Sequence, residues 1–203
     1  MPTFSQIRPL AIFGLFILSV SAFFGCESYE PYPRPYGFHR IDLPAVADRV
    51  YTQYSSKDCP FTFEYPSYAV PKQKHRDSCD VDIRFEDNQL DWFFTYRFDP
   101  AGNAQGRQYE DYRRLIYKHS KKATQITETP IQLGNAQGIM FEIYGNVGTP
   151  AQLFLYDSTQ QHYLMVACYF ETALKNDSLA PVIQYMKEEL QHMAGSIDWE
   201  PQS

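Results

Sequence analysis

The chain has 203 residues, of which 44% are hydrophobic and 16% aromatic, and its formal net charge is -6. This length fits one folded domain, and the aromatic content excludes a wholly disordered chain. The net negative charge repels the phosphate backbone of nucleic acids, so we expect no nucleic-acid partner. Four cysteines are too few for a disulfide scaffold.

The amino-terminal segment has the pattern of an export signal. Arg8 is its one charged residue, and an uncharged apolar run extends from Leu10 to Gly25. At about 1.5 Å per residue this run spans about 24 Å, which is shorter than the roughly 30 Å hydrocarbon core of a bilayer. Gly25-Cys26 fits the cleavage site of a bacterial lipoprotein signal, so we predict a signal peptide over residues 1–25 and acylation of Cys26. An uncleaved membrane anchor is the alternative.

A proline-rich stretch follows the predicted lipid site. Pro31, Pro33 and Pro35 alternate with other residues, which favours an extended polyproline-like spacer. Such a spacer reaches about 35 Å. We therefore expect residues 26–37 to tether a globular domain, residues 38–203, to a membrane; a ligand for a partner module is the alternative interpretation of the Pro/Tyr motif.

The first part of the globular region reads as strands and then as a helix. Apolar and polar residues alternate in Phe61–Pro66 and in Val81–Phe85, and Leu90–Phe98 is rich in aromatic residues, so all three are predicted strands. From Tyr109 to Ala123 the period changes to that of an amphipathic helix.

The second part adds strands and a long terminal helix. Ile139–Asn146 is a predicted strand, and Ala151–Phe170 is a predicted hairpin that turns at Asp157–Gln160. The last helix begins at Asp177 or Ser178 and ends at Gly195, and a short strand can follow it. This order predicts a single-domain α+β fold in which helices pack against an antiparallel sheet.

The pentapeptide GNAQG occurs twice, at Gly102–Gly106 and Gly134–Gly138. The flanking sequences of the two copies differ, so an internal repeat is not indicated. Neither copy has the strand-to-helix context of a phosphate-binding loop. Both are predicted to be polar turns.

Candidate chemistry in the sequence is sparse. No local pattern marks a catalytic residue, a metal ligand or a cofactor site, so we predict a non-enzymatic protein without cofactors. Cys59 and Cys79 flank predicted strands in an exported chain and are candidates for a disulfide, whereas Cys168 reads as a buried small apolar residue. The histidines are scattered along the chain at His39, His75, His119, His162 and His192.

Four segments resemble a known family in the same order and at similar spacing. The chain is similar to the gliding motility lipoprotein GldD family of Bacteroidetes from about Pro35 to Trp199. The segments that carry the resemblance are PYGFHRIDLP (Pro35–Pro44), CPFTFEYPSYA (Cys59–Ala69), YRRLIYKHSKKA (Tyr112–Ala123) and DSLAPVIQYMKEEL (Asp177–Leu190). The strand order also resembles, more distantly, the PsbP-like fold.

The resemblance implies a lipid-anchored envelope protein that is required for gliding and linked to type IX secretion. It matches Cys26 to the family's lipidated position and supports the pairing of Cys59 with Cys79. The expected partners are a membrane, reached through acyl groups such as palmitate on Cys26, and other gliding or secretion proteins of the envelope. The expected location is the outer membrane, with the inner membrane as the alternative.

A second hypothesis assigns a ligand to the aromatic strand. Trp92, Phe93, Phe94 and Tyr96 alternate between the two faces of Leu90–Phe98, so some of them are expected to be exposed. A concave patch of these rings would bind a small envelope ligand such as a glycan or a lipid.

Overall fold

The computed structural model describes residues 43–74, 78–85, 90–171 and 176–199. All of them belong to one compact unit, residues Gly37–Ser203. The predicted signal peptide, Cys26 and the proline-rich tether lie outside the described residues, as do the side chains of Asp177 and Ser178, the predicted helix caps.

The described chain alternates strands with two α-helices and three short helical turns. The helices are α2 (Tyr109–Tyr117) and α3 (Asn176–Gly195), and the turns are η1 (Val46–Asp48), η2 (Ala104–Gln108) and η3 (Lys118–Lys121). The strands are β1 (Tyr51–Tyr54), β2 (Phe61–Pro66), β3 (Val70–Gln73), β4 (Val81–Phe85), β5 (Leu90–Phe98), β6 (Ala123–Leu133), β7 (Ala136–Gly145), β8 (Ala151–Tyr156), β9 (His162–Phe170) and β10 (Asp198–Trp199).

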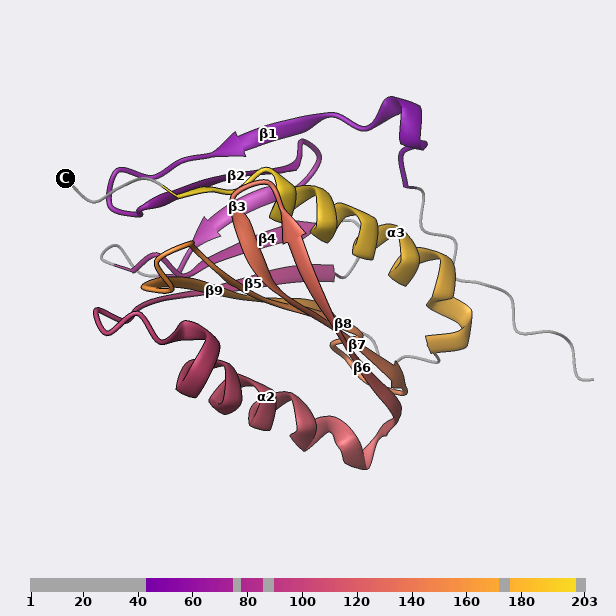
Figure 1. Ribbon diagram of the computed structural model, residues 1–203. Coiled ribbons are helices and arrows are strands. Elements are labelled where there is room, and N and C mark those ends of the chain that lie inside the picture. Colours follow the sequence, from indigo (N-terminus) through magenta and orange to yellow (C-terminus); the bar gives the residue numbers. More distant parts are fainter. Residues whose placement is uncertain (1–42, 75–77, 86–89, 172–175, 200–203) are drawn as a thin grey trace, which may run out of the picture. The chain divides into compact units, whose positions relative to one another are not determined.

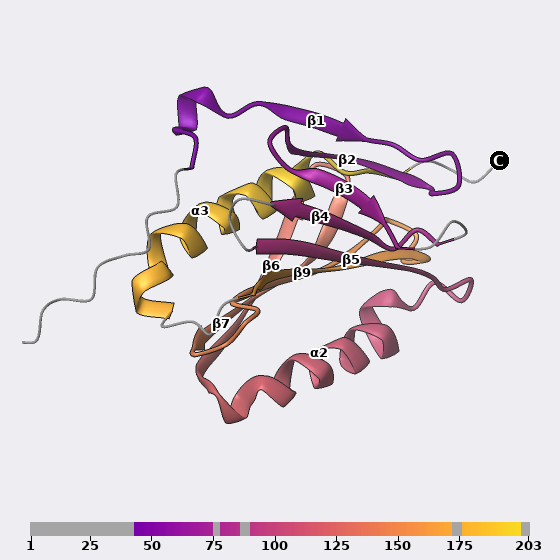
Figure 2. The ribbon, with the colours of Figure 1, turned by 180° about the vertical axis from the view of Figure 1, so that it is seen from behind.

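Two antiparallel sheets organise these strands. The larger sheet has seven strands in the order β3-β4-β5-β9-β8-β7-β6, and the smaller one has the order β1-β2-β10. Figure 1 shows α2 on one face of the large sheet, and α3 with the small sheet on the other. The view from behind shows the same layers (Figure 2). The predicted α+β class with an antiparallel sheet is therefore confirmed.

Strand alternation separates the apolar side chains into two cores. On β9, Leu164 and Val166 point into the core that α3 and the small sheet cover, whereas Tyr163 and Met165 point toward α2. Successive side chains of a strand face opposite sides, so one strand contributes to both layers. The two-sided burial explains why the central strands read as nearly continuous apolar runs.

Stacked aromatic rings join the small sheet to the large one. Phe63 on β2 and Phe94 on β5 are fully buried, and their ring centroids lie 4.6 Å apart. Phe61 and Trp92 are also fully buried. Aromatic pairs at this separation add about 0.5–1.5 kcal/mol beyond the area they bury, so this stack is a main contact between the layers.

Helix α2 is shorter than predicted because a short turn after it leads the chain into an edge strand. The α-helix ends at Tyr117, the turn η3 follows, and β6 begins at Ala123, where the predicted helix was expected to end. Tyr109 and Tyr117 both donate hydroxyl hydrogen bonds to Glu128 of β6, at 2.5 and 2.6 Å. These bonds fix the helix along β6.

A disulfide joins the beginning of β2 to the beginning of β4. Cys59 and Cys79 are bonded, with Cα atoms 5.4 Å apart, which lies within the ordinary range for disulfides. The third described cysteine, Cys168, is free and buried on β9, and burial raises the pKa of its thiol.

Replacing Cys59 and Cys79 together by serine is expected to lower the free energy of unfolding by about 3 kcal/mol, because the open chain regains the entropy of a loop of 20 residues. Urea denaturation of the oxidised protein and of the double variant measures the difference. The reduced wild-type protein is the control and should resemble the variant. Equal stability of the oxidised and reduced proteins would contradict the prediction.

Candidate binding groove

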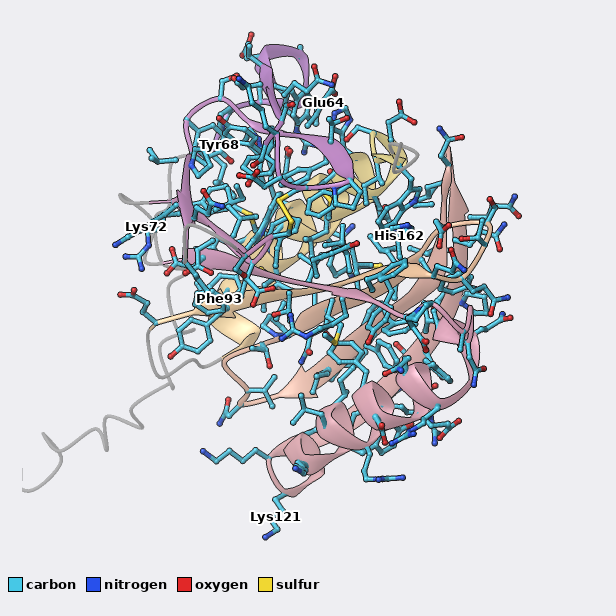
Figure 3. The ribbon with its side chains drawn as sticks, turned by 90° about the vertical axis from the view of Figure 1, so that its left-hand side faces the viewer. Glu64, Tyr68, Lys72, Phe93, Lys121 and His162 are labelled. Atoms are coloured by element: carbon cyan, nitrogen blue, oxygen red, sulfur yellow. A yellow bond between two sulfur atoms is a disulfide. The ribbon has the colours of Figure 1, made fainter. Side chains whose placement is uncertain are left out.

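A groove of about 640 Å³ opens at one end of the sheets. Four chain segments form it: the end of β5 at Phe98, the β6–β7 turn at Asn135, the β8–β9 turn, and β10 with Asp198 and Trp199. His162, the first residue of β9, lies in its wall, and we call this cavity the His162 groove. Figure 3 labels His162 on the opposite side of the view from Lys72 and Phe93.

Asp157 folds the β8–β9 turn that forms one wall. Its carboxylate accepts hydrogen bonds from the backbone N–H groups of Thr159 and His162, at 3.1 and 2.9 Å, and from the Thr159 hydroxyl. Burial of Asp157 acts to raise the pKa of its carboxyl, but these hydrogen bonds outweigh it and lower the pKa overall. The turn closes through Gln160, whose φ is 59°.

An Asp157→Ala variant is expected to lose about 1–3 kcal/mol of stability at pH 7, because three donors of the turn lose their acceptor. The pKa of Asp157 is lower in the folded protein than its ordinary value of 3.8. The ionised carboxylate therefore stabilises the fold at pH values above 3.8, and this stabilisation is lost as the pH falls through the pKa of the folded protein. The difference in free energy of unfolding between the wild type and Asp157→Ala should therefore become smaller at acidic pH. Urea unfolding at pH 7 and pH 3 (about one unit below the ordinary value) measures it; a pH-independent difference would contradict it.

The two GNAQG turns meet at the His162 groove. Gly134 and Asn135 of the second copy line the groove directly. Gly102 of the first copy has a φ of +63°, and a Cβ there would lie 2.9 Å from the Thr159 carbonyl, so this turn packs tightly against the groove wall. Gly134 has a φ of +55°, and a Cβ there would lie 2.5 Å from the Gly195 carbonyl oxygen. The prediction of two polar turns holds only in part: Gly134 and Asn135 form a turn before β7 begins at Ala136, whereas Ala104–Gly106 of the first copy belong to the helical turn η2.

Aromatic side chains fix the imidazole of His162 in the groove wall. The Tyr96 hydroxyl and His162 Nδ1 share a hydrogen bond of 2.7 Å. The ring of His162 lies 4.9 Å from that of Phe98 and 6.4 Å from that of Trp199. Burial and the nearby charge of Asp157 raise the pKa of Tyr96 to about 12, so its phenol is protonated at neutral pH. The hydrogen bond and the ring contacts therefore hold Phe98, His162 and Trp199 in a fixed arrangement along the groove wall.

The aromatic residues of the second hypothesis do not form one exposed patch. Trp92 and Phe94 are fully buried in the core beneath α3 and the small sheet, so the prediction that this set binds a ligand is wrong for these two residues. The small sheet covers the face that they occupy. Tyr96 is held by His162, and Phe93 lies on the other face of β5 beside Tyr169, with 5.5 Å between the ring centroids.

A second hollow of about 660 Å³ lies between α3 and the ends of β6 and β7. Its lining includes the cations Lys122 and Lys187 together with Tyr144 and Ile183. Lys187 forms an ion pair with Glu142 of β7. Glu142 also lines this hollow, which therefore contains two lysines and one carboxylate, whereas the described lining of the His162 groove contains no lysine or arginine.

The two histidines whose side chains the structure describes, His162 and His192, each form a hydrogen bond with one neighbouring side chain. His192 Nε2 lies 2.8 Å from a Glu64 carboxylate oxygen, but the nearby Ser196 donates its hydroxyl to the Met193 carbonyl instead. Among the described residues, no group of three His, Cys, Asp or Glu side chains is placed to hold a metal ion. No helix in the described part of the chain is both long and apolar enough to cross a bilayer.

Comparisons with known proteins give one family. The family model described as gliding motility lipoprotein GldD matches residues 28–199. No curated protein matches the chain. Among solved structures, the cyanobacterial PsbP (CyanoP) from Synechocystis sp. PCC 6803 is similar over 78% of this chain and 98% of that chain, with 12% identity and a TM-score of 0.46. At that score the likeness supports no argument about function.

Proposed function

Since the chain belongs to the gliding motility lipoprotein GldD family, we propose that it is a lipid-anchored, non-catalytic component of the cell envelope that is required for gliding and linked to type IX secretion. The family match over residues 28–199 is the observation that carries this proposal. It begins two positions after Cys26 and extends to the last described strand, so it covers most of the proposed tether and of the folded domain but not Cys26 itself.

The proposed anchor is Cys26, acylated after removal of residues 1–25. One acyl chain gives only marginal membrane binding, whereas two or three chains on one residue hold a protein stably. The spacer with Pro31, Pro33 and Pro35 would hold the folded domain, residues 38–203, away from the bilayer surface. We place the protein at the outer membrane, facing other gliding or secretion proteins.

The proposed role of the folded domain is to contact other proteins of the envelope. The exposed edge of β3, which includes Pro71 and Lys72, carries features that prevent uncontrolled strand pairing. Recognition would therefore depend on surfaces other than this edge.

Deletion of the gene tests the proposal in the native organism. The deletion strain is expected to form non-spreading colonies on agar and to retain type IX cargo, and a plasmid copy of the wild-type gene should restore both. Colony spreading and the cargo content of the culture medium are measured. Normal spreading would refute the motility role, and normal cargo release with lost spreading would refute the link to secretion.

A further inference from the structure

We propose that the His162 groove binds a neutral carbohydrate chain. This inference goes beyond the anchoring and motility roles and depends on neither. It follows from three properties of the groove: a partly exposed aromatic wall, a hydrogen-bonded pair of amide and carboxylate side chains in the same lining, and the absence of lysine and arginine from the lining among the described residues.

The aromatic wall offers flat apolar faces in a fixed arrangement. Phe98 is 47% exposed although it ends a strand of the central sheet. Its ring lies beside that of His162, which Tyr96 holds by a hydrogen bond of 2.7 Å. Trp199 completes the row and is itself supported by the buried Phe61, at 6.2 Å between the ring centroids. The negative face of an aromatic ring attracts the weakly positive C–H groups of a sugar ring.

The groove lining also carries polar groups that can bind sugar hydroxyls. Asn135 donates an amide hydrogen bond to one carboxylate oxygen of Asp198, at 3.1 Å, and both residues are exposed. This bond fixes the two side chains and leaves a second carboxylate oxygen and an amide oxygen to accept hydrogen bonds. The hydroxyl groups of a sugar can donate hydrogen bonds to these acceptors. Gln137 lies beside this pair in the same wall.

The charges select against anionic ligands. The described lining of the groove contains Asp157 and Asp198 but neither lysine nor arginine. Asp157 has its oxygens occupied by Thr159 and His162, so Asp198 is the carboxylate that faces a ligand. Phosphates, fatty acids and acidic glycans would meet repulsion here, whereas the other hollow contains Lys122 and Lys187. A volume of about 640 Å³ is typical of ligand sites and fits a short oligosaccharide.

Tryptophan fluorescence gives a direct measurement of binding. The chain has two tryptophans, of which Trp92 is fully buried and Trp199 lines the groove. We would titrate the full lipoprotein, purified in a detergent without a sugar head group, with maltohexaose, cellohexaose and the hexamer of N-acetylglucosamine. At least one of these probes is expected to produce a saturable fluorescence change.

Matched variants identify the site. Phe98→Ala is expected to weaken binding about tenfold, and Phe98→Tyr to retain it, because the ring face supplies the contact. Tyr144→Ala is the control, since Tyr144 is 45% exposed in the other hollow, and it should bind as the wild type does. Failure of all three sugars, equal binding by Phe98→Ala, or a matching loss in Tyr144→Ala would each overturn the proposal. So would binding of a lysine-rich peptide to the groove without binding of any sugar.

Discussion

A Cys26→Ser variant is expected to disappear from the membrane fraction or to accumulate as an uncleaved precursor that retains residues 1–25. The thioether to the lipid requires the sulfur of Cys26, and serine cannot replace it. Each methylene group of a buried acyl chain contributes about 0.8 kcal/mol to membrane binding, so loss of two or three chains removes essentially all of the anchoring. Cell fractionation and mass spectrometry of the mature amino terminus measure both outcomes.

The control removes a different thiol. Cys168 is fully buried on β9, and Cys168→Ala should leave the lipid adduct, incorporation of labelled palmitate and membrane fraction unchanged. A Cys26→Ser protein of normal mature size that still sediments with membranes would contradict the lipid assignment. Because the folded domain is unaltered by the substitution, loss of gliding in this strain would show that anchoring itself is required.

Central strands were predictable from the sequence, whereas of the described edge strands only β10, the short strand expected after the last helix, was. The bounds of β2, β4 and β5 agree with the predicted segments because their apolar residues alternate or run continuously. β6 was missed: it is an edge strand with Pro130 near its end and is largely exposed or half-buried, so no apolar pattern marks it. β1 and β3 were missed as well, since each has four residues and little burial.

The aromatic strand shows what periodicity leaves undetermined. Alternation correctly placed Trp92 and Phe93 on opposite faces of β5, but it does not indicate which face another layer covers. The small sheet of β1, β2 and β10 buries Trp92 and Phe94, and it assembles from segments at both ends of the described chain. Only the tertiary arrangement distinguishes a core ring from an exposed one.

The His162 groove could not be predicted from the sequence either, because it too depends on the tertiary arrangement. Its residues come from separate turns, and Phe98, Asn135, His162 and Trp199 are far apart in the sequence. Strand order brings these turns to one end of the sheets, and no local motif encodes that order. The repeated GNAQG turns were the available indication, because a turn that requires a positive φ at its first glycine marks a position where the backbone packs closely.

Arg49, near the beginning of the described chain, forms ion pairs with two glutamates of α3. Its Nη2 lies 2.9 Å from a Glu188 oxygen, its Nε lies 3.1 Å from a Glu189 oxygen, and its guanidinium lies 4.2 Å from the centroid of the Tyr185 ring. Burial opposes the charge on Arg49, but the hydrogen bond to Glu188 and the charge of Glu189 raise its pKa overall. The Glu189 side chain is only 1% exposed, so Arg49 is its compensating charge.

An Arg49→Met variant is therefore expected to lose about 3–5 kcal/mol of stability, because it leaves the buried Glu189 carboxylate without its compensating positive charge. Glu188→Ala is the matched control: the Glu188 side chain is 42% exposed, and its loss should lower stability by at most about 1 kcal/mol. In the double variant Arg49→Met/Glu189→Met, most of the stability should return, since neither charge remains buried. Urea unfolding of the four proteins at pH 7 measures these differences. If Arg49→Met and Glu188→Ala were equally stable, the pairing of Arg49 with Glu189 would not be what holds the amino-terminal segment of the domain to α3.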